Sequence, residues 1–392
     1  MPARVSAQES GTERYGDLRA AVRELCSRFG DAYWREQDRA RRYPTEFVDE
    51  MIRSGWLAAL IPVEYGGSGL GVAEASVVLE EIHRQGGNAA ACHAQMYVMG
   101  TLLHHGSSEQ KRRYLPRIAR GELRLQAFGV TEPTAGSEST RIATTAVRDG
   151  DHYVVNGQKI WTSRLEQSDL MLLLARTTPY EELEDKTLGL SVFIVDLRAA
   201  GTSLESRPIE TMLNHSTNEV FFRDLHVPVA DLIGEEGRGF RYIIDSWNAE
   251  RILIAAECIG DGRWFVERAS RYARERVVFG RPIGQNQGVS FPLARAYADV
   301  EAADLMRWKA ARLFDDGAAC GAEANMAKLL ASEASWQAAN ACLDTHGGFG
   351  FAVDYDVERK FRETRLYTVA PINNNLVLAY VAQHVLGLPK SY

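Results

Sequence analysis

The feature that most constrains the fold is a spacing of apolar residues that changes twice along the chain. Residues 45–55 and 72–84 repeat apolar side chains every three or four positions, which is typical of amphipathic helices. Near residue 124 the repeat shortens to that of strands, and from about residue 238 the helical repeat returns. The chain is therefore predicted to fold as a helical region, a β region and a second helical region, without the strand–helix alternation that builds a parallel nucleotide-binding sheet.

The β region is marked by short strand-like runs and tight-turn dipeptides. The dipeptides at 149–150 (Asp-Gly) and 156–157 (Asn-Gly) separate three such runs, which predicts two consecutive hairpins. Further strand-like runs follow at 170–174, 190–195 and 219–222. Together these runs predict an antiparallel β domain.

The second helical region is predicted to form a bundle, because three of its helical patterns are long. They cover 240–272, 292–315 and 322–343, with a shorter one at 376–386. A chain of 392 residues is also longer than one hydrophobic core usually organises. We therefore expect three domains: an amino-terminal helical domain at 1–122, a central β domain at 123–235 and a carboxy-terminal helical bundle at 236–392.

Charge and composition exclude several classes of function. The formal net charge of −7 gives no electrostatic reason to bind nucleic acid. No run approaches the roughly 18 consecutive apolar residues of a membrane helix, so we expect no membrane association and a cytoplasmic location. The five cysteines form no C-x-x-C pair, and the histidines lack metal-ligand spacing, so no metal site is expected and the cysteines are predicted to be buried apolar residues.

The segment 129–138, GVTEPTAGSE, combines small residues, hydroxyl side chains and a proline just before the β runs. Such a loop offers free backbone N–H groups and hydroxyls to an anionic or heteroaromatic ligand. On composition alone, an ordinary linker between domains explains it equally well.

Four motifs together resemble the acyl-CoA dehydrogenase flavoprotein family. The segment 129–138 and the segment 150–163, GDHYVVNGQKIWTS, are similar to the family patterns T-E-P-x-A-G-S and N-G-x-K-x-W-x-[TS]. The segment 276–287, RVVFGRPIGQNQ, resembles R-x-x-F-G-x-x-[IL]-x-x-x-Q, and HGGFGF at 346–351 resembles a G-G-x-G segment. The resemblance covers nearly the whole chain and implies the acyl-CoA dehydrogenase fold, multi-domain with α and β parts.

The resemblance implies an FAD cofactor held between the β domain and the carboxy-terminal helices, with part of the site supplied by a neighbouring subunit. The matching positions around the flavin and phosphates are Val130, Thr131, Gly136, Ser137, Trp161 and Ser163. The positions that match the residues supplied by the neighbouring subunit are Arg276, Phe279, Gln287, Gly347 and Gly348. A homo-oligomer, either a dimer or a tetramer, is therefore expected. The guanidinium of Arg276 suits the pyrophosphate of FAD, and the indole of Trp161 can cover an aromatic ring.

Glu250 is the expected catalytic base. The resemblance implies removal of an α-proton from an acyl-CoA thioester by a carboxylate while the β-hydrogen leaves as hydride to flavin N5, giving an enoyl-CoA. In many members the base stands in a Y-E-G-T stretch, but here Pro371 occupies that place, whereas Glu250 matches the base position of isovaleryl- and long-chain-type members. Its helical neighbours are largely apolar, and burial would raise its pKa and suit it to proton abstraction. The alternative is a structural glutamate paired with an arginine.

The substrate-binding residues are expected next to Glu250 and on an earlier helix. Arg251 is expected to orient the site or contact CoA. The region 93–99 resembles the helix that floors the acyl pocket, which makes His93, Gln95 and Met96 candidate substrate contacts. His93, Gln95 and Tyr97 favour a short or polar acyl chain. The resemblance also implies fatty acid metabolism and an electron-transferring flavoprotein as the electron acceptor.

Pro371 supports a different hypothesis as well. The family uses the backbone N–H at this position to hold the thioester oxygen, and proline has none, while Asn373 replaces a threonine near the flavin. A member with altered flavin chemistry, such as an acyl-CoA reductase, desulfinase or oxidase, is therefore the alternative. A third hypothesis is a catalytically silent flavoprotein or a DNA-associated relative, and the acidic balance argues against DNA.

Overall fold

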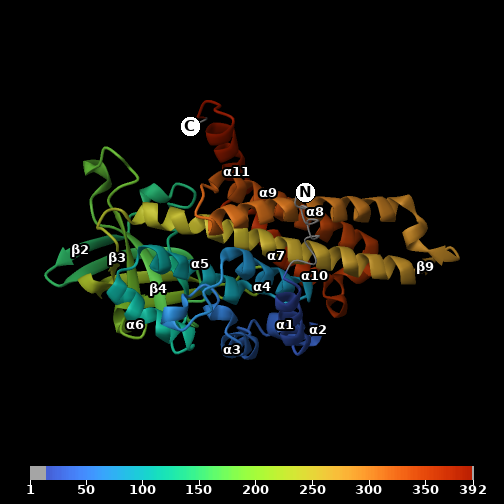
Figure 1. Ribbon diagram of the computed structural model, residues 1–392, viewed down its shortest axis with the longest axis horizontal. Helices are drawn as coiled ribbons and strands as arrows, with labels where there is room; N and C mark the ends of the chain where they lie inside the picture. The colour runs from blue at the N-terminus through green and yellow to red at the C-terminus, as the bar shows by residue number, and fades with distance from the viewer. Residues whose placement is uncertain (1–14, 391–392) are drawn as a thin grey trace, which may run out of the picture.

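The computed structural model describes residues 15–390 and confirms the order of a helical, a β and a second helical region (Figure 1). The first region holds α1 (Gly16–Ser27), α2 (Asp31–Arg39), α3 (Thr45–Arg53), α4 (Val72–Arg84), α5 (Ala90–His105) and α6 (Ser108–Ala119). In Figure 1, α4 and α5 lie between α1–α3 and the long carboxy-terminal helices. The change in apolar spacing therefore predicted the architecture, while the exact domain boundaries stay predictions.

Local sequence and distant contacts both fix the ends of these helices. Before α6, the Ser107 hydroxyl accepts a hydrogen bond from the Gln110 N–H at 3.1 Å, and the Gln110 side chain accepts one from the Ser107 N–H at 2.9 Å. At the start of α4, by contrast, the Asp315 carboxylate accepts the N–H groups of Val72 and Ala73 at 2.7 and 2.9 Å. That cap comes from the end of α8 (Gln287–Asp315) and joins the two helical regions.

The β region forms one sheet at the end of the molecule opposite β9 (Val277–Val278) (Figure 1). Its strands are β1 (Leu125–Gly129), β2 (Thr145–Asp149), β3 (His152–Ser163), β4 (Leu170–Arg176), β5 (Leu190–Asp196), β6 (Leu204–Ile209), β7 (Thr217–Pro228) and β8 (Leu232–Ile233). The order is β6-β7-β3-β2-β4-β5-β8, with β1 on β4. Most pairs are antiparallel as predicted, but β4 pairs in parallel with both β1 and β2.

The prediction of a second hairpin at Asn156-Gly157 was wrong. β3 runs unbroken through this dipeptide, and its register against β7 shifts between Val155 and Gly157. The Asn156 side chain donates to the Asp224 carboxylate at 3.0 Å and accepts the Asp224 N–H at 2.9 Å. A Cβ on Gly157 would lie 2.6 Å from the Cα of Thr144, so the close strand contact requires glycine. The dipeptide therefore forms a bulge and not a turn.

The carboxy-terminal region is organised by α7 (Gly239–Glu275), a helix of 37 residues. It runs from the sheet to the opposite end of the molecule, where β9 (Val277–Val278) and β10 (Arg281–Pro282) form a small hairpin (Figure 1). The rest of the region consists of α8 (Gln287–Asp315), α9 (Gly321–His346), α10 (Val357–Arg365) and α11 (Asn374–Tyr380). The long helices confirm the predicted bundle, whereas the helix predicted at 376–386 ends as a π-helical turn from Val381.

Several general expectations concern the whole chain. All five cysteines are buried and unpaired, as predicted. Between residues 15 and 390, none of the helices combines the length and apolar character needed to cross a bilayer.

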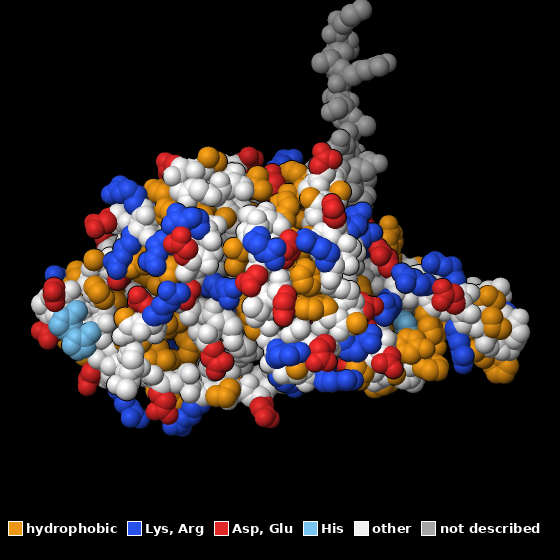
Figure 2. Space-filling view, turned by 90° about the horizontal axis from the view of Figure 1, so that it is seen from below, with side chains coloured by type: hydrophobic (Ala, Val, Ile, Leu, Met, Phe, Trp, Pro, Cys, Tyr) orange, Lys and Arg blue, Asp and Glu red, His pale blue; other side chains and the backbone are white. Residues whose placement is uncertain are grey.

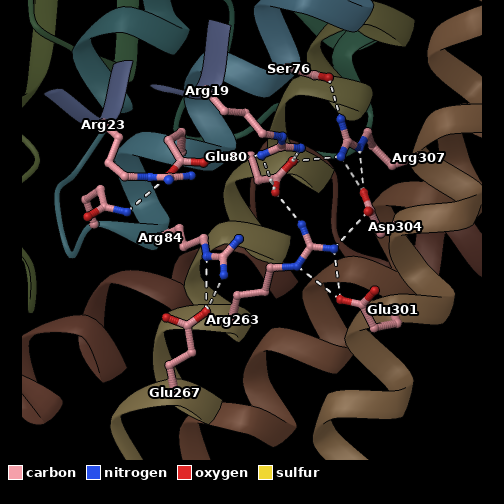
Figure 3. A network of polar contacts seen from close by, with 12 residues as sticks. Arg19, Arg23, Ser76, Glu80, Arg84, Arg263, Glu267, Glu301, Asp304 and Arg307 are labelled. Carbon is pink, nitrogen blue, oxygen red and sulfur yellow. Dashed lines mark hydrogen bonds and ion pairs between the residues drawn. The ribbon is translucent and has the colours of Figure 1, made fainter. Parts of the chain in front are cut away.

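A buried ionic cluster, which we call the Glu80 cluster, joins four helices (Figure 3). Glu80 of α4 is fully buried and contacts Arg19 of α1 and Arg307 of α8, each at 2.8 Å, together with Arg263 of α7. Asp304 of α8 lies 2.9 Å from Arg263 and also pairs with Arg307. Each of these arginines has a carboxylate partner, so charge inside the helical layer is compensated.

Candidate functional site

A buried ion pair fixes the loop at 130–138 beside β3. Lys159 of β3 donates from Nζ to the backbone oxygen of Val130 at 3.0 Å and lies 2.7 Å from a Glu132 carboxylate oxygen. Burial lowers the pKa of Lys159 to about 8, although Glu132 opposes the shift. The other contacts of Glu132 are the N–H groups of Ala143 and Thr144, at 2.7 and 2.9 Å. Neither charged residue of this pair was identified as functional from the sequence.

The predicted cofactor residues of the β domain lie around this fixed loop. The N–H of Ile160 donates to the oxygen of Thr131 at 2.8 Å, which places Val130 and Thr131 next to the strand that carries Trp161 and Ser163. The Trp161 side chain is 55% exposed and its φ is 62°. Exposure of a large indole fits a residue that covers a planar ligand.

The end of the same loop remains open and contacts the carboxy-terminal region. A Cβ on Gly136 would meet no atom within 4 Å. The hydroxyl of Ser137 accepts a hydrogen bond from the Asn373 side chain at 3.3 Å. The loop thus runs from Val130 and Thr131 beside β3 to Ser137 beside Asn373, and its hydroxyls and open backbone, with the exposed Trp161 ring, have the chemistry to hold a flavin nucleotide.

The remaining predicted cofactor residues lie at the opposite end of α7. Arg276 follows the last residue of α7, and its guanidinium carbon lies 5.9 Å from the centre of the Phe349 ring. Phe279 is wholly exposed in the β9–β10 hairpin, and Figure 2 shows apolar side chains at this tip. Gln287, Gly347 and Gly348 belong to the same end. One chain therefore does not bring the two groups of predicted residues together.

Glu250 is a buried carboxylate on α7 with no partner among residues 15–390. Its side chain is 5% exposed, and neither a hydrogen bond nor an ion pair is formed with the described residues. Burial raises its pKa to about 7, and the nearby positive groups of His93 and Arg251 oppose that shift. A carboxylate with this pKa can take up or release a proton near neutral pH.

Arg251 lies beside Glu250 and is itself buried. One terminal nitrogen donates to the Asn248 side chain at 3.4 Å, and its buried Nε has no hydrogen-bond partner in the described part of the chain. Burial lowers the pKa of Arg251, and Glu250 opposes the shift. An incompletely paired guanidinium at this place is available to a ligand or to the Glu250 carboxylate.

Lys328 of α9 is a second buried cation near Glu250, and the sequence did not identify it. Its Nζ donates to the backbone oxygen of Ile372 at 2.6 Å and to the Asn374 side chain at 2.7 Å. Burial lowers its pKa to about 8. Lys328 thus holds the segment that follows Pro371, the position without a backbone N–H.

The three predicted substrate contacts of α5 point to different surroundings. Nδ1 of His93 lies 3.3 Å from Oε1 of Glu257, a carboxylate on α7. Gln95 donates to the backbone oxygen of Leu57 at 3.4 Å, and its own oxygen has no partner among the described residues. Met96 belongs to the hydrophobic core of the helical layers. Of the three, His93 lies nearest to the α7 carboxylates.

Behind Glu250, α7 carries two further buried acids that the sequence analysis missed. Glu257 and Asp261 follow Glu250 by seven and eleven positions, a spacing that places all three on one helix face. The Ala89 N–H donates to Nε2 of His83 at 3.1 Å, so Nδ1 carries the proton and donates to Asp261 at 2.8 Å. Burial raises the pKa of Glu257, but the nearby His93 and His83 side chains outweigh it and the net shift is downward. The helical spacing of these acids was the available signal.

No group of three or more His, Cys, Asp or Glu side chains within the described residues is arranged to hold a metal ion.

Known proteins resemble this chain over almost its whole length. Models of the N-terminal, middle and C-terminal domains of acyl-CoA dehydrogenase match residues 12–122, 127–225 and 237–386. Acyl-CoA dehydrogenase FadE12 of Mycobacterium tuberculosis is 37% identical over 378 residues, 96% of each chain. The 3-(aryl)acrylate reductase of Clostridium sporogenes is 32% identical, covering 96% of this chain and 99% of its own. A solved glutaryl-coenzyme A dehydrogenase with glutaryl-CoA has a TM-score of 0.89 at 30% identity, covering 100% of this chain and 98% of that one.

Proposed function

This chain belongs to the acyl-CoA dehydrogenase family of FAD-dependent oxidoreductases, and on that premise we propose that it converts an acyl-CoA thioester to the α,β-enoyl-CoA with Glu250 as the base. The observation that carries the proposal is the buried, unpaired Glu250 carboxylate, whose pKa of about 7 suits proton transfer. The sequence resemblance to isovaleryl- and long-chain-type members supports the same residue.

Glu250 would take the α-proton on a carboxylate oxygen as the Cα–H bond breaks. The β-hydrogen leaves with its electron pair, so the substrate loses one proton and one hydride and gains a double bond. Arg251 and His93, which favour the ionised carboxylate, keep part of the Glu250 population ready to accept a proton at neutral pH. Burial excludes water that would otherwise stabilise the carboxylate and weaken it as a base.

FAD, when bound, would supply the acceptor for the departing hydride. We assign its binding to the two groups of residues already described. The β-domain group consists of Val130, Thr131, Gly136, Ser137, Trp161 and Ser163. Arg276, Phe279, Gln287, Gly347 and Gly348 would come from a second copy of the chain. The separation of the groups along α7 and the complete exposure of Phe279 support a dimer or tetramer.

The acyl-CoA is expected to lie between α5 and α7. Arg251 is assigned to orient the carboxylate or to contact CoA, and His93, Gln95 and Met96 are assigned to the acyl pocket. The family resemblance supports an electron-transferring flavoprotein as the acceptor of the electrons.

Glu250→Gln in the holoenzyme tests the proposal directly. The variant should keep bound flavin, because the change removes a charge and little volume, but substrate should no longer bleach the flavin absorbance. Glu267→Gln is the matched control, since Glu267 lies on the same helix, is 50% exposed and pairs with Arg84. It should bleach like the wild type. Bleaching by the Glu250→Gln variant at the wild-type rate would rule out Glu250 as the base.

Altered flavin chemistry remains the second candidate because Pro371 lacks an N–H to hold the thioester oxygen. The relationship to a 3-(aryl)acrylate reductase gives a precedent for the reverse reaction in this family. Anaerobic incubation with saturated acyl-CoAs should yield enoyl-CoA if the enzyme is a dehydrogenase. Peroxide or sulfite formed in air would instead indicate an oxidase or desulfinase, and faster oxidation of reduced flavin by enoyl-CoA would indicate a reductase.

A further inference from the structure

Arg164 is a buried cation that the proposed reaction does not use. It follows Ser163 at the end of β3, and its side chain is 7% exposed. Within residues 15–390 it forms no ion pair with a carboxylate, and its one side-chain partner is Nδ1 of His215 at 3.4 Å. Burial lowers the pKa of Arg164, and the charge of Glu257, which forms no ion pair with Arg164, only partly opposes that shift.

The histidine beside Arg164 does not supply that counter-charge. Arginine nitrogens can only donate, so Nδ1 of His215 must accept. Burial, together with the charges of Arg164 and His93, lowers the pKa of His215 well below its usual value. His215 is therefore neutral and leaves the full positive charge on Arg164.

Arg164 and His215 line a cavity between the β domain and the first helical region. The two carboxylates in the same lining already have cationic partners. Asp38 lies 2.7 Å from Arg362, and Glu363 lies 3.0 Å from Arg359. Arg164 is thus the cation of this cavity whose charge no described carboxylate meets directly.

The same arginine is close to the proposed catalytic carboxylate. Burial and the charge of Glu250 raise the pKa of Tyr97, while Arg164 lowers it, so Tyr97 lies within electrostatic range of both. The ring centres of Tyr97 and His93 are 5.0 Å apart. Ala90 and Ala91, which precede His93 on α5, also line the cavity of Arg164. The cavity therefore adjoins the helix assigned to the acyl pocket, where the acyl chain of a substrate reacting at Glu250 would extend.

We propose that Arg164 binds a carboxylate at the far end of the acyl chain, so that the substrates are CoA thioesters of dicarboxylic acids. The inference rests on the proposed function and specifies its substrate class. A carboxylate matches the planar guanidinium by two parallel hydrogen bonds. A methyl-terminated chain would instead leave the charge buried and unpaired, which is unfavourable. The step at Glu250 is unchanged, because the distal carboxylate takes no part in the transfer of proton or hydride.

Binding to the Glu250→Gln holoenzyme, which should not turn over, isolates recognition from chemistry. Succinyl-, glutaryl- and adipyl-CoA are compared by calorimetry with butyryl-, pentanoyl- and hexanoyl-CoA, so that each pair matches in chain length. The best dicarboxylic thioester should bind at least about tenfold tighter than its methyl-terminated match, as expected for a paired buried charge. Adding Arg164→Met should abolish the preference, and Arg164→Lys should retain part of it because the charge remains.

Flavin content, flavin absorbance and melting temperature are measured on each variant as controls. Equal or weaker binding of every dicarboxylic thioester would overturn the inference, even if Arg164→Met fails to fold. A preference that survives Arg164→Met would overturn it as well, and a flavin spectrum changed in that variant would then assign Arg164 to the cofactor.

Flavin bleaching of the wild type separates the two proposals. Bleaching by methyl-terminated thioesters without a binding preference leaves the proposed function standing, whereas no bleaching by any thioester contradicts the function itself.

Discussion

At the scale of single residues, two carboxylates on one face of α7 have opposite electrostatic environments. Burial dominates at Glu250 and raises its pKa to about 7. At Glu257, seven positions later, the neighbouring His93 and His83 side chains outweigh burial and the pKa is lowered. The first carboxylate is therefore suited to exchanging a proton, and the second to remaining ionised as a fixed negative charge.

The raised pKa of Glu250 predicts how rate and stability depend on pH. Because the base must be ionised, the rate of flavin reduction should rise with pH through about 7. The folded-state pKa also lies above the ordinary value of 4.5, so the folded chain holds this proton more tightly than the unfolded chain. The contribution of Glu250 to stability is full below about pH 4.5 and is lost as pH rises through about 7.

Glu250→Gln should therefore stabilise the protein above neutral pH by up to about 3 kcal/mol and give no gain near pH 4. Glu257→Gln is the matched control and should lose stability at neutral pH, because it removes the negative partner of His93. Urea unfolding across the pH range measures both differences. Equal effects of the two substitutions would contradict the assigned environments.

At the scale of secondary-structure elements, the Glu80 cluster makes the packing of α1, α4, α7 and α8 depend on one carboxylate (Figure 3). Glu80→Gln should lower the free energy of unfolding by roughly 3–5 kcal/mol, because three buried arginines lose the carboxylate that they share and their charge is then only partly compensated. Glu267→Gln removes an exposed ion pair nearby and should change stability by less than about 1 kcal/mol. Chemical denaturation gives both values, and similar losses in the two variants would show that the cluster contributes no more than a surface pair.

The elements also show where sequence reasoning succeeds. Periodic apolar spacing is a local property, so α7, α8 and α9 were predicted to within a few residues. The Asn156-Gly157 dipeptide was misinterpreted because bulge and turn share the same residues, and the difference lies in the opposing strand β7. Glu250 was identified from the resemblance to isovaleryl- and long-chain-type members, and its apolar helical neighbours supported the choice. Arg164 and Lys328 were missed, because the absence of a counter-charge depends on chain segments far away in the sequence.

At the scale of the whole molecule, the β9–β10 tip should be needed for assembly and flavin retention. Phe279→Asp places a charge on a fully exposed ring position, and Asp tolerates its positive φ of 53°. The variant should dissociate and lose flavin while keeping its helical circular dichroism. Val147→Asp, at a position 64% exposed in β2, is the control and should remain assembled. Light scattering and flavin absorbance decide the outcome, and an intact flavin-bound oligomer of Phe279→Asp would contradict the assembly proposal.

The length of α7 has a genetic consequence under the proposed assembly. Glu250 and Arg276 are 26 positions apart, about 39 Å along a helix, so one subunit would serve two different reaction centres. A chain that lacks Glu250 and another that lacks Arg276 would each be inactive alone. Co-expressed, they would complement each other, because the mixed pair assembles one centre with both defects and one with neither. Two inactive alleles would then restore activity between them.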